Sequence, residues 1–278
     1  CRIAPPDIAV VTTVGPAHLE TMGSIENIAR EKGDLVEHMR TGGPAILNID
    51  NEHVAAMTER TSGDVWRVSV HNNPDADITA HNIRYDASGA SFTVRDDTGT
   101  EATFQTQLLG EHNVLNILLA VAVGRSMGLR LRQMAHAVRR VEPVEHRLAL
   151  RQDGPVTVID DAFNSNPVGA RNAVDILSQM DAGRRVVVTP GMVELGEAQW
   201  DANKAFGAHI AQQDVDLAVL VGEEQTEAIQ EGLRSHQFPD DRMKVFPTLF
   251  DAQDFLKSYL RPGDVVLYEN DLPDQYEA

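Results

Sequence analysis

The chain is 278 residues long, carries a formal net charge of −18 and is 42% hydrophobic, which predicts a globular protein of about two domains. The acidic charge argues against nucleic acid or an anionic membrane as a partner, and without an apolar run of about 18 residues no transmembrane segment is predicted. A single cysteine excludes an internal disulfide framework and favours a cytoplasmic location.

The first half of the chain alternates strand and helix patterns. The predicted strands are 8–14, 44–49 and 64–69, and the predicted helices are 24–39 and 52–60. Ser24 is the expected N-cap of the first helix. Further along, the hydrophobic period changes to two, which predicts an antiparallel addition with strands at 78–83, 90–94 and 102–106. Helices are then predicted at 113–127 and 131–140, with Gly128 closing the first of them.

Residues 142–144 (E-P-V) form the best domain boundary, because proline removes a backbone donor and breaks the preceding helix. We therefore expect one domain at 1–144 and another at 145–278. After the boundary, five short strands alternate with four helices, which predicts a parallel, Rossmann-like sheet. The strands are 156–159, 185–188, 217–221, 243–245 and 265–268, and the helices are 168–180, 200–212, 226–235 and 252–259. No G-x-G-x-x-G follows the first of these strands, so the fold by itself predicts no dinucleotide site.

The loop after the first strand has the layout of a ligand site. It reads G-P-A-H-L-E at 15–20, and the helix that follows carries Lys32. The ends of strands in open α/β sheets are where ligands bind. A lone histidine such as His18 is more often a hydrogen-bonded structural residue, and most lysines on helices are simply solvated. The spacing alone leaves both interpretations open.

Two further segments carry polar residues at the start of an element. Residues 110–116 read G-E-H-N-V-L-N and open a long helix, so spacing alone favours an ordinary helix start. Asparagine also offers a donor and an acceptor to a base edge, which Asn113 and Asn116 could use. Arg147 follows the domain boundary; a surface arginine is the common case, but its guanidinium can grip phosphate oxygens.

In the second domain, polar segments follow two of the predicted strands. Residues 158–167 read V-I-D-D-A-F-N-S-N-P, which combines adjacent carboxylates with a proline in the first turn of a helix. Residues 189–197 read T-P-G-M-V-E-L-G-E and place Glu194 between two glycines. A cap with a turn-forming residue explains the first segment as well as a site does. An ordinary strand–helix connection explains the second.

Taken in order, these motifs resemble the Mur ligases, the ATP-dependent amide-forming enzymes of peptidoglycan precursor synthesis. The resemblance spans nearly the whole chain. It implies the C-terminal part of the central ATPase domain, with its antiparallel addition, at 1–144, and the complete C-terminal domain at 145–278. It also implies ATP and Mg²⁺ as cofactors, with His18 and a carbamylated Lys32 as metal ligands and catalytic residues.

The resemblance carries further roles to matching positions. It implies that Asn113 and Asn116 contact adenine, with Asn116 the preferred contact, and that Arg147 reaches the ATP phosphates. Asp161 would take the nucleotide or ribose side. It also implies a catalytic Asn164 facing the reacting groups, beside a Phe163 where tyrosine is more usual.

On the substrate side, the resemblance implies that Asn166 binds substrate and that Glu194 holds the incoming amine or accepts its proton. The motifs match best the members that add D-alanyl-D-alanine to UDP-N-acetylmuramoyl-tripeptide. Those members usually have a basic turn, K-[GA]-S-R-G, after the last strand, whereas residues 269–271 here are E-N-D. This acidic turn leaves open an amide synthase of another pathway. We expect small-molecule substrates, namely a UDP-linked muramoyl peptide and an amino acid or dipeptide, and a monomer.

The phosphate loop of such ligases, G-x-x-x-x-G-K-[ST], is absent from these 278 residues, and none of the four lysines follows a glycine. We therefore expect the chain to be the C-terminal part of a longer protein and to be inactive alone. A non-catalytic binding protein on the same fold is the alternative from a different class.

Overall fold

The computed structural model describes residues 4–15, 22–144, 146–162 and 166–270. The chain forms two compact units. The first consists of residues up to 83 with 91–106 and 111–141, and the second of 84–90, 107–110 and 142 onward. None of the helices within the described ranges is long and apolar enough to cross a membrane.

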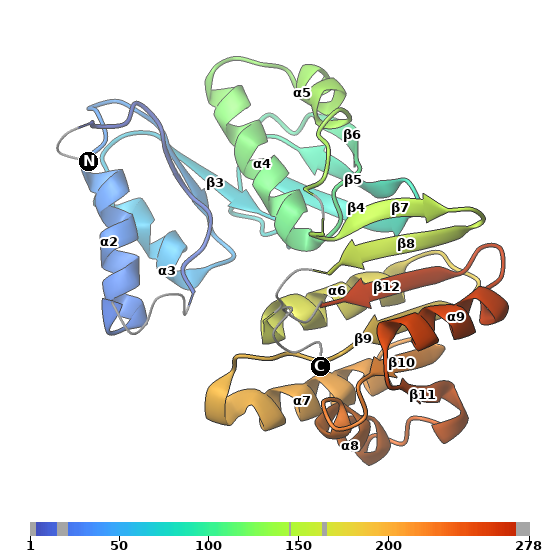
Figure 1. The fold of residues 1–278 in the computed structure, drawn as a ribbon. Coiled ribbons are helices and arrows are strands. Elements are labelled where there is room, and N and C mark those ends of the chain that lie inside the picture. The colour runs from blue at the N-terminus through green and yellow to red at the C-terminus, as the bar shows by residue number, and fades with distance from the viewer. Residues whose placement is uncertain (1–3, 16–21, 145, 163–165, 271–278) are drawn as a thin grey trace. The chain divides into compact units, whose positions relative to one another are not determined.

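The first unit is built on a six-stranded sheet with the order β1-β2-β3-β4-β5-β6 (Figure 1). Its strands are β1 (Ala9–Val11), β2 (Ala45–Asn48), β3 (Val65–Ser69), β4 (Ile78–Asp86), β5 (Gly89–Arg95) and β6 (Glu101–Thr106). β1 to β4 pair in parallel. Residues 87–88 are all that separate β4 from its neighbour β5, too few for a parallel crossover, so these strands are antiparallel as predicted.

The helices of the first unit agree with the sequence pattern except in one place. They are α2 (Ile25–Glu37), α3 (Glu52–Ala55), the 3₁₀ helix η1 (Ala56–Arg60), α4 (Glu111–Ser126) and α5 (Leu131–Val138). Ser24 caps α2 as predicted, accepting the Asn27 N–H at 3.3 Å. The helix predicted over 52–60 is present, but only its first turn is α-helical; the chain then tightens into the 3₁₀ helix η1, a common way for a helix to end.

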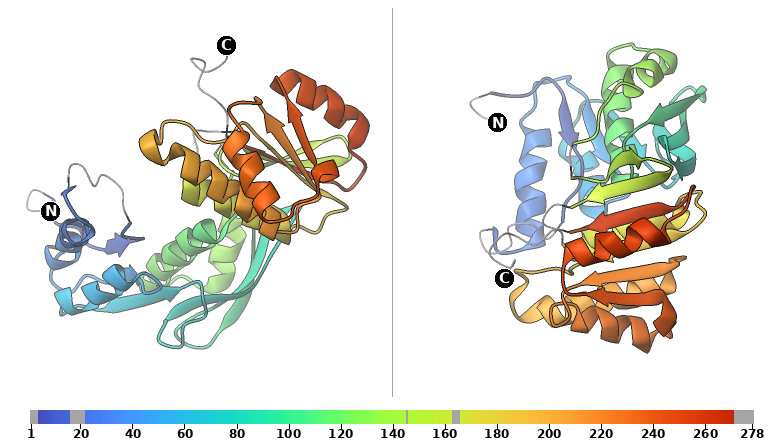
Figure 2. Two further views of the ribbon diagram at one scale, coloured as in Figure 1. Left: turned by 90° about the horizontal axis from the view of Figure 1, so that it is seen from below. Right: turned by 45° about the vertical axis from the view of Figure 1, so that its right-hand side comes forward.

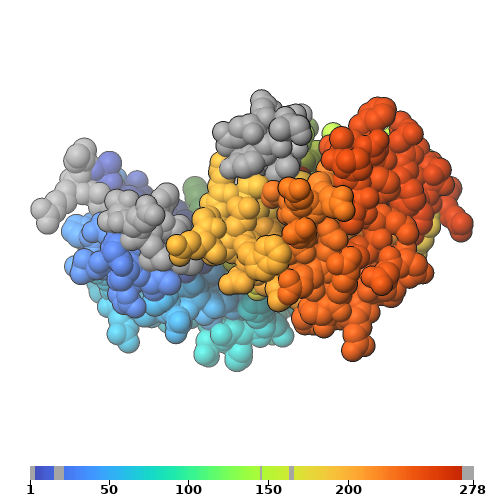
Figure 3. All heavy atoms as spheres, turned by 60° about the horizontal axis from the view of Figure 1, so that its bottom comes forward, coloured from blue at the N-terminus to red at the C-terminus, as the bar shows by residue number. Residues whose placement is uncertain are grey.

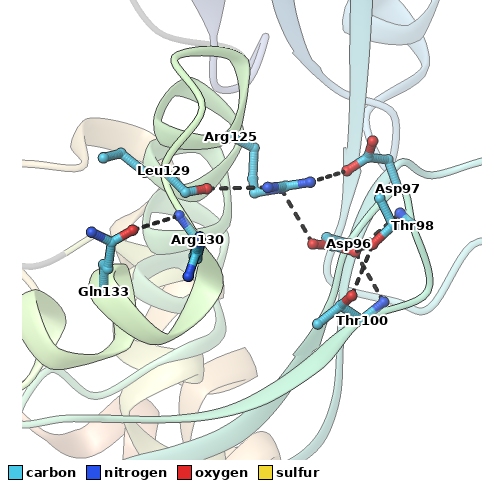
Figure 4. Close-up of polar contacts among 8 residues, drawn as sticks. All are labelled: Asp96, Asp97, Thr98, Thr100, Arg125, Leu129, Arg130 and Gln133. Carbon is cyan, nitrogen blue, oxygen red and sulfur yellow. Dashed lines mark hydrogen bonds and ion pairs between the residues drawn. The ribbon is translucent and has the colours of Figure 1, made fainter.

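The C-terminal end of α4 is fixed by its own turn and by an ion-pair cluster (Figure 4). Gly128, at φ +85°, allows the Leu129 N–H to reach Gly124 O at 2.9 Å, which confirms the predicted helix end. Arg125 lies 3.2 Å from the Asp96 carboxylate, which is almost fully buried in the β5–β6 turn. This cluster anchors the helix that carries Asn113 in its first turn.

The second unit contains another six-stranded sheet, ordered β11-β10-β9-β12-β8-β7. Its strands are β7 (Ala149–Asp153), β8 (Val156–Asp161), β9 (Arg185–Thr189), β10 (Leu217–Val221), β11 (Met243–Phe246) and β12 (Val265–Glu269). The five predicted strands are present and parallel. The edge strand β7 was not predicted, and it pairs antiparallel with β8. Its residues beyond Ala149 are largely exposed and polar, so its sequence lacks the apolar alternation of a strand.

Helices cover both faces of this sheet (Figure 2). They are α6 (Pro167–Gln179), α7 (Gln199–Gln212), α8 (Glu227–Ser235) and α9 (Leu249–Tyr259), with the short 3₁₀ helices η2 (Gly196–Ala198) and η3 (Asp240–Arg242). Alternate strand residues such as Val186 and Val188 pack against Leu256 of α9 on one face. On the other side, α7 and α8 lie against each other (Figure 3).

Candidate functional site

In the first unit, side chains of other elements hold residues 12–14, which follow β1. The carbonyl group of each of these three residues accepts a hydrogen bond from such a side chain. The pairs are Asn48 Nδ2 to Thr12 O at 2.9 Å, Lys32 Nζ to Thr13 O at 2.6 Å and Asn51 Nδ2 to Val14 O at 2.9 Å. This backbone leads directly into the predicted site loop, whose His18 lies outside the described residues.

Asn48 and Asn51 were not singled out from the sequence. Asn48 ends β2, and Asn51 also caps α3 by accepting the Val54 N–H at 3.1 Å. The signal that could have found them is a pair of amide side chains at the carboxyl end of a parallel strand, next to the strand that carries the predicted loop.

Lys32 is exposed on α2, and its ammonium group donates to a backbone carbonyl. A protonated amine repels a cation, so this donor set fits Mg²⁺ only if Lys32 is carbamylated and presents oxygen atoms. No group of three His, Cys, Asp or Glu side chains suited to a metal occurs within the described part of the chain. His18, the other predicted ligand, lies outside the described residues, so the magnesium site stays a prediction.

Asn113 and Asn116 lie three residues apart in the first turns of α4 and so share one side of the helix. Asn113 is half-buried and Asn116 is exposed. An exposed amide at this position has the donor and acceptor needed to contact a base edge. Their predicted role at adenine stays a prediction.

In the second unit, β8 ends in two carboxylates with different surroundings. The Asp160 side chain is buried, forms an ion pair with Arg151 and a hydrogen bond with His146 Nδ1 at 3.0 Å, and accepts the Ala162 N–H at 3.2 Å. These contacts make Asp160 a structural residue that ties β7 and the preceding linker to β8.

The neighbouring Asp161 is half-buried and accepts the Leu148 N–H at 3.0 Å. Burial raises the pKa of Asp161 above the usual aspartate range, against the opposing effects of the Leu148 hydrogen bond and the charge of Arg147. Arg147 itself is exposed. The role at the nucleotide that the family resemblance implies for Asp161 stays a prediction.

Asn166 begins α6, and its Oδ1 accepts the N–H groups of Val168 at 3.1 Å and Gly169 at 3.0 Å. Pro167 occupies the first turn as predicted. The side-chain oxygen of Asn166 is thus an N-cap, and its predicted contact with substrate stays a prediction. The other asparagine of this motif, Asn164, lies outside the described residues.

The loop after β9 carries Glu194 at an unusual backbone angle. Gly191 has φ +83° and Glu194 has φ +63°, the left-handed region that glycine adopts more readily than other residues. Glu194 is exposed, whereas residues 191–193 are buried. The Gly191 N–H donates to Thr189 Oγ1 at 3.0 Å, which folds the loop back onto the end of its own strand.

Asn270 joins the two predicted motifs of the second unit. Its backbone N–H donates to Asp161 O at 3.2 Å, and its side-chain Nδ2 donates to Gly191 O at 2.6 Å. The connection exists because β12 lies between β8 and β9 in the sheet. Asp161 and the Glu194 loop therefore come to the same edge, although 33 residues separate them in the sequence.

The acidic turn at 269–271 differs from its sequence-based interpretation. Glu269 is fully buried, and Asn270 is nearly so. Glu269 is therefore not an exposed carboxylate of this turn, and Asp271 lies outside the described residues.

Comparison with known proteins places both units in one family. Residues 1–124 match the Mur ligase middle domain, and residues 146–268 match the glutamate ligase domain of the Mur ligases. UDP-N-acetylmuramoyl-tripeptide–D-alanyl-D-alanine ligase of Mycobacterium tuberculosis (strain CDC 1551) is 35% identical over 286 residues, which covers 96% of this chain and 56% of that protein. The enzyme of the same name from Bacillus subtilis (strain 168) is 27% identical, and the match covers 96% of this chain and 57% of that protein.

Solved structures of proteins called MurF are also similar to this chain. A crystal structure of MurF from Acinetobacter baumannii superposes with a TM-score of 0.78 at 26% identity, covering 99% of this chain and 59% of that one. MurF from Thermotoga maritima, solved with ADP, shares the fold with a TM-score of 0.76 at 21% identity, and the match covers 98% of this chain and 60% of that one. The chain spans about half the length of the curated relatives it matches. The chain belongs to the Mur ligase family.

Proposed function

We propose that the protein carrying this chain is an ATP-dependent ligase that joins UDP-N-acetylmuramoyl-tripeptide to D-alanyl-D-alanine in the cytoplasm. The names of the relatives support this substrate pair, and the family supports the use of ATP. The observation that carries the proposal is the edge of the second sheet, where Asn270 connects Asp161 to the Glu194 loop. We propose a domain boundary at 144/145 and a monomeric protein.

The reaction would proceed in two steps. The tripeptide carboxylate attacks the γ-phosphorus of ATP, ADP leaves, and an acyl phosphate forms. The amine nitrogen of D-alanyl-D-alanine then attacks the acyl carbon, the C–O bond to phosphate breaks, and the nitrogen loses a proton. Glu194, an exposed carboxylate, would hold the ammonium group and take the proton whose loss frees the nitrogen lone pair for attack. The second proton, lost as the amide forms, would go to the departing phosphate.

The remaining predicted residues would bind the nucleotide and the acyl group. Asn113 and Asn116 would contact adenine, Arg147 the phosphates, and Asp161 the ribose. Asn164 and Asn166 would face the reacting carbonyl.

Lys32 and His18 would hold Mg²⁺, with the lysine as its carbamate. The cation, when bound, would neutralise charge on the transferred phosphoryl group. Incubation with ¹³C-labelled bicarbonate, followed by ¹³C NMR, should reveal a carbamate signal in the wild-type protein that Lys32→Arg lacks. A spectrum unchanged by that substitution would contradict the modification.

The proposed function is tested by ligation with a longer form of the protein that includes the phosphate loop, supplied with ATP and Mg²⁺. UDP-N-acetylmuramoyl-tripeptide is offered with D-alanyl-D-alanine and, separately, with other amines, and the products are weighed by mass spectrometry. Pentapeptide with matching phosphate release supports the proposal. Product with a different amine only would assign an amide synthase of another pathway. ATP binding without product from any amine would favour the binding-protein alternative.

A further inference from the structure

We propose that Asn203 and Asn270 are positioning residues that hold the backbone before Glu194 so that this carboxylate meets the amine substrate. The inference rests on the proposed ligase function for the identity of that substrate. Asn203 belongs to none of the motifs that pointed to the site, and Asn270 lies in the 269–271 turn, for which the sequence pattern indicated no positioning role.

Asn203, on α7, binds the loop through both ends of its amide group. Its Oδ1 accepts the Met192 N–H at 2.8 Å, and its Nδ2 donates to Met192 O at 2.8 Å. Nδ2 also donates to Gln199 O at 3.0 Å within its own helix. The side chain is 2% exposed, so water cannot replace these bonds. Asn203 therefore pairs with Met192 much as a neighbouring strand would.

Asn270, which follows β12, binds Gly191, the residue before Met192. It is 5% exposed, and its Nδ2 donates to Gly191 O at 2.6 Å while its backbone is fixed to β8. Its φ of +64° lies in the left-handed region, which asparagine tolerates better than most residues. The two asparagines together bind the polar groups of two consecutive loop residues.

The loop is also closely fitted against Asn203. A Cβ atom added at Gly191 would lie 2.8 Å from Asn203 Oδ1, and the positive φ of this residue would strain a side chain as well. The backbone at 191–192 therefore has one arrangement that satisfies both amides. Two residues later the chain reaches Glu194.

Glu194 has a left-handed backbone conformation, which the contacts of Asn203 and Asn270 with residues 191–192 would help to maintain. A left-handed backbone is unfavourable for glutamate and persists only when its surroundings determine it. Its side chain is exposed and lies outside the buried core. A carboxylate held rigidly at the edge of a parallel sheet suits a ligand-binding task.

Asn270→Gly is the sharpest test, because glycine adopts φ +64° without strain and the change removes only the side chain. In the ligation assay described above we expect the KM for D-alanyl-D-alanine to rise about 5- to 10-fold, the effect of one lost hydrogen bond, with the KM for ATP within about 2-fold of wild type. Gln230→Met is the control. Gln230 lies on α8, its side-chain amide is buried and its Nε2 donates to Glu223 O at 3.3 Å, and its loss should change neither KM.

A double-mutant cycle separates positioning from general stability. In a Glu194→Gln background, Asn270→Gly should add no further loss, because the group it positions is already gone. An equal loss in both backgrounds, or an unchanged KM for D-alanyl-D-alanine in the single variant, would overturn the inference.

Hydrogen exchange tests, without an activity assay, whether Asn203 and Asn270 hold the loop at 191–194; we call this pair of asparagines the clamp. In the 278-residue chain, Asn270→Gly should speed amide exchange at 191–194 by about 5- to 10-fold, while the other β9 amides keep their protection. Unchanged exchange would contradict the clamp. Failure of the wild-type protein to ligate any substrate would instead reject the proposed function, and the exchange result would still decide whether the loop is held.

Discussion

Asp160 and Asp161 are adjacent carboxylates that the fold uses differently. Asp160 is buried, has its charge compensated by Arg151 and forms a hydrogen bond with His146. Asp161 accepts one backbone hydrogen bond, and burial raises its pKa. An ionised Asp161 therefore opposes folding, which suggests that the residue is kept for binding and not for stability.

Asp161→Asn should make the chain more stable at neutral pH. Because folding raises the pKa, the folded state binds the proton more tightly, and the free energy of unfolding falls as pH rises through the raised pKa. Asparagine keeps the oxygen that accepts from Leu148 and removes the charge. Thermal unfolding should show a higher Tm at pH 7, a gain that disappears below the ordinary aspartate pKa, together with loss of ligation in the longer protein.

The matched control is Asp160→Asn, one residue earlier. It removes the charge that pairs with Arg151 and lies beside His146, both partly exposed, so we expect it to lower the free energy of unfolding by about 1–2 kcal/mol at pH 7. Equal effects of the two substitutions would contradict the different roles assigned to these aspartates.

At the scale of elements, α7 and α8 approach closely through glycine. A Cβ atom at Gly207 would lie 2.1 Å from Ile229 O, and one at Gly232 would lie 2.1 Å from Lys204 O. Both obstacles are backbone atoms of the facing helix. The same α7 carries Asn203, so this contact also holds the helix that binds the Glu194 loop.

Gly207→Ala should destabilise the chain although alanine is the better helix former. The clash with backbone is expected to cost about 1–3 kcal/mol after the propensity gain of about 0.5–1 kcal/mol. Gly33→Ala in α2 is the control, because its new Cβ would meet the flexible end of Arg60, which can move. Chemical denaturation should show Gly33→Ala near wild type or slightly more stable; a similar loss in both variants would contradict the backbone contact.

At the scale of the whole molecule, the chain supplies parts of a Mur ligase without its phosphate loop. No G-x-x-x-x-G-K-[ST] occurs in the sequence. The net charge of −18 adds general repulsion toward a nucleotide, so binding needs local cations.

The 278-residue chain alone should release no phosphate from ATP and Mg²⁺ above background, because its sequence lacks the G-x-x-x-x-G-K-[ST] motif that cradles the β- and γ-phosphates. A longer form of the protein that contains the loop is the control and should release phosphate when its substrates are present. ATP hydrolysis by the 278-residue chain at an ordinary ligase rate would contradict this expectation.

The sequence by itself determined the family, the alternation of strands and helices and the segments at the strand ends. These features depend on local periodicity, caps and short motifs, as at Ser24, Gly128 and Pro167. It missed β7, whose exposed polar residues form a strand only because β8 offers an unpaired edge.

The tertiary structure alone decided which side chains meet. Insertion of β12 between β8 and β9 brings Asn270 to both Asp161 and Gly191, and packing of α7 brings Asn203 to Met192. It also distinguished Asp160 from Asp161 and buried Glu269. Such contacts depend on strand order and burial, which join residues far apart in the chain and leave no local pattern in the sequence.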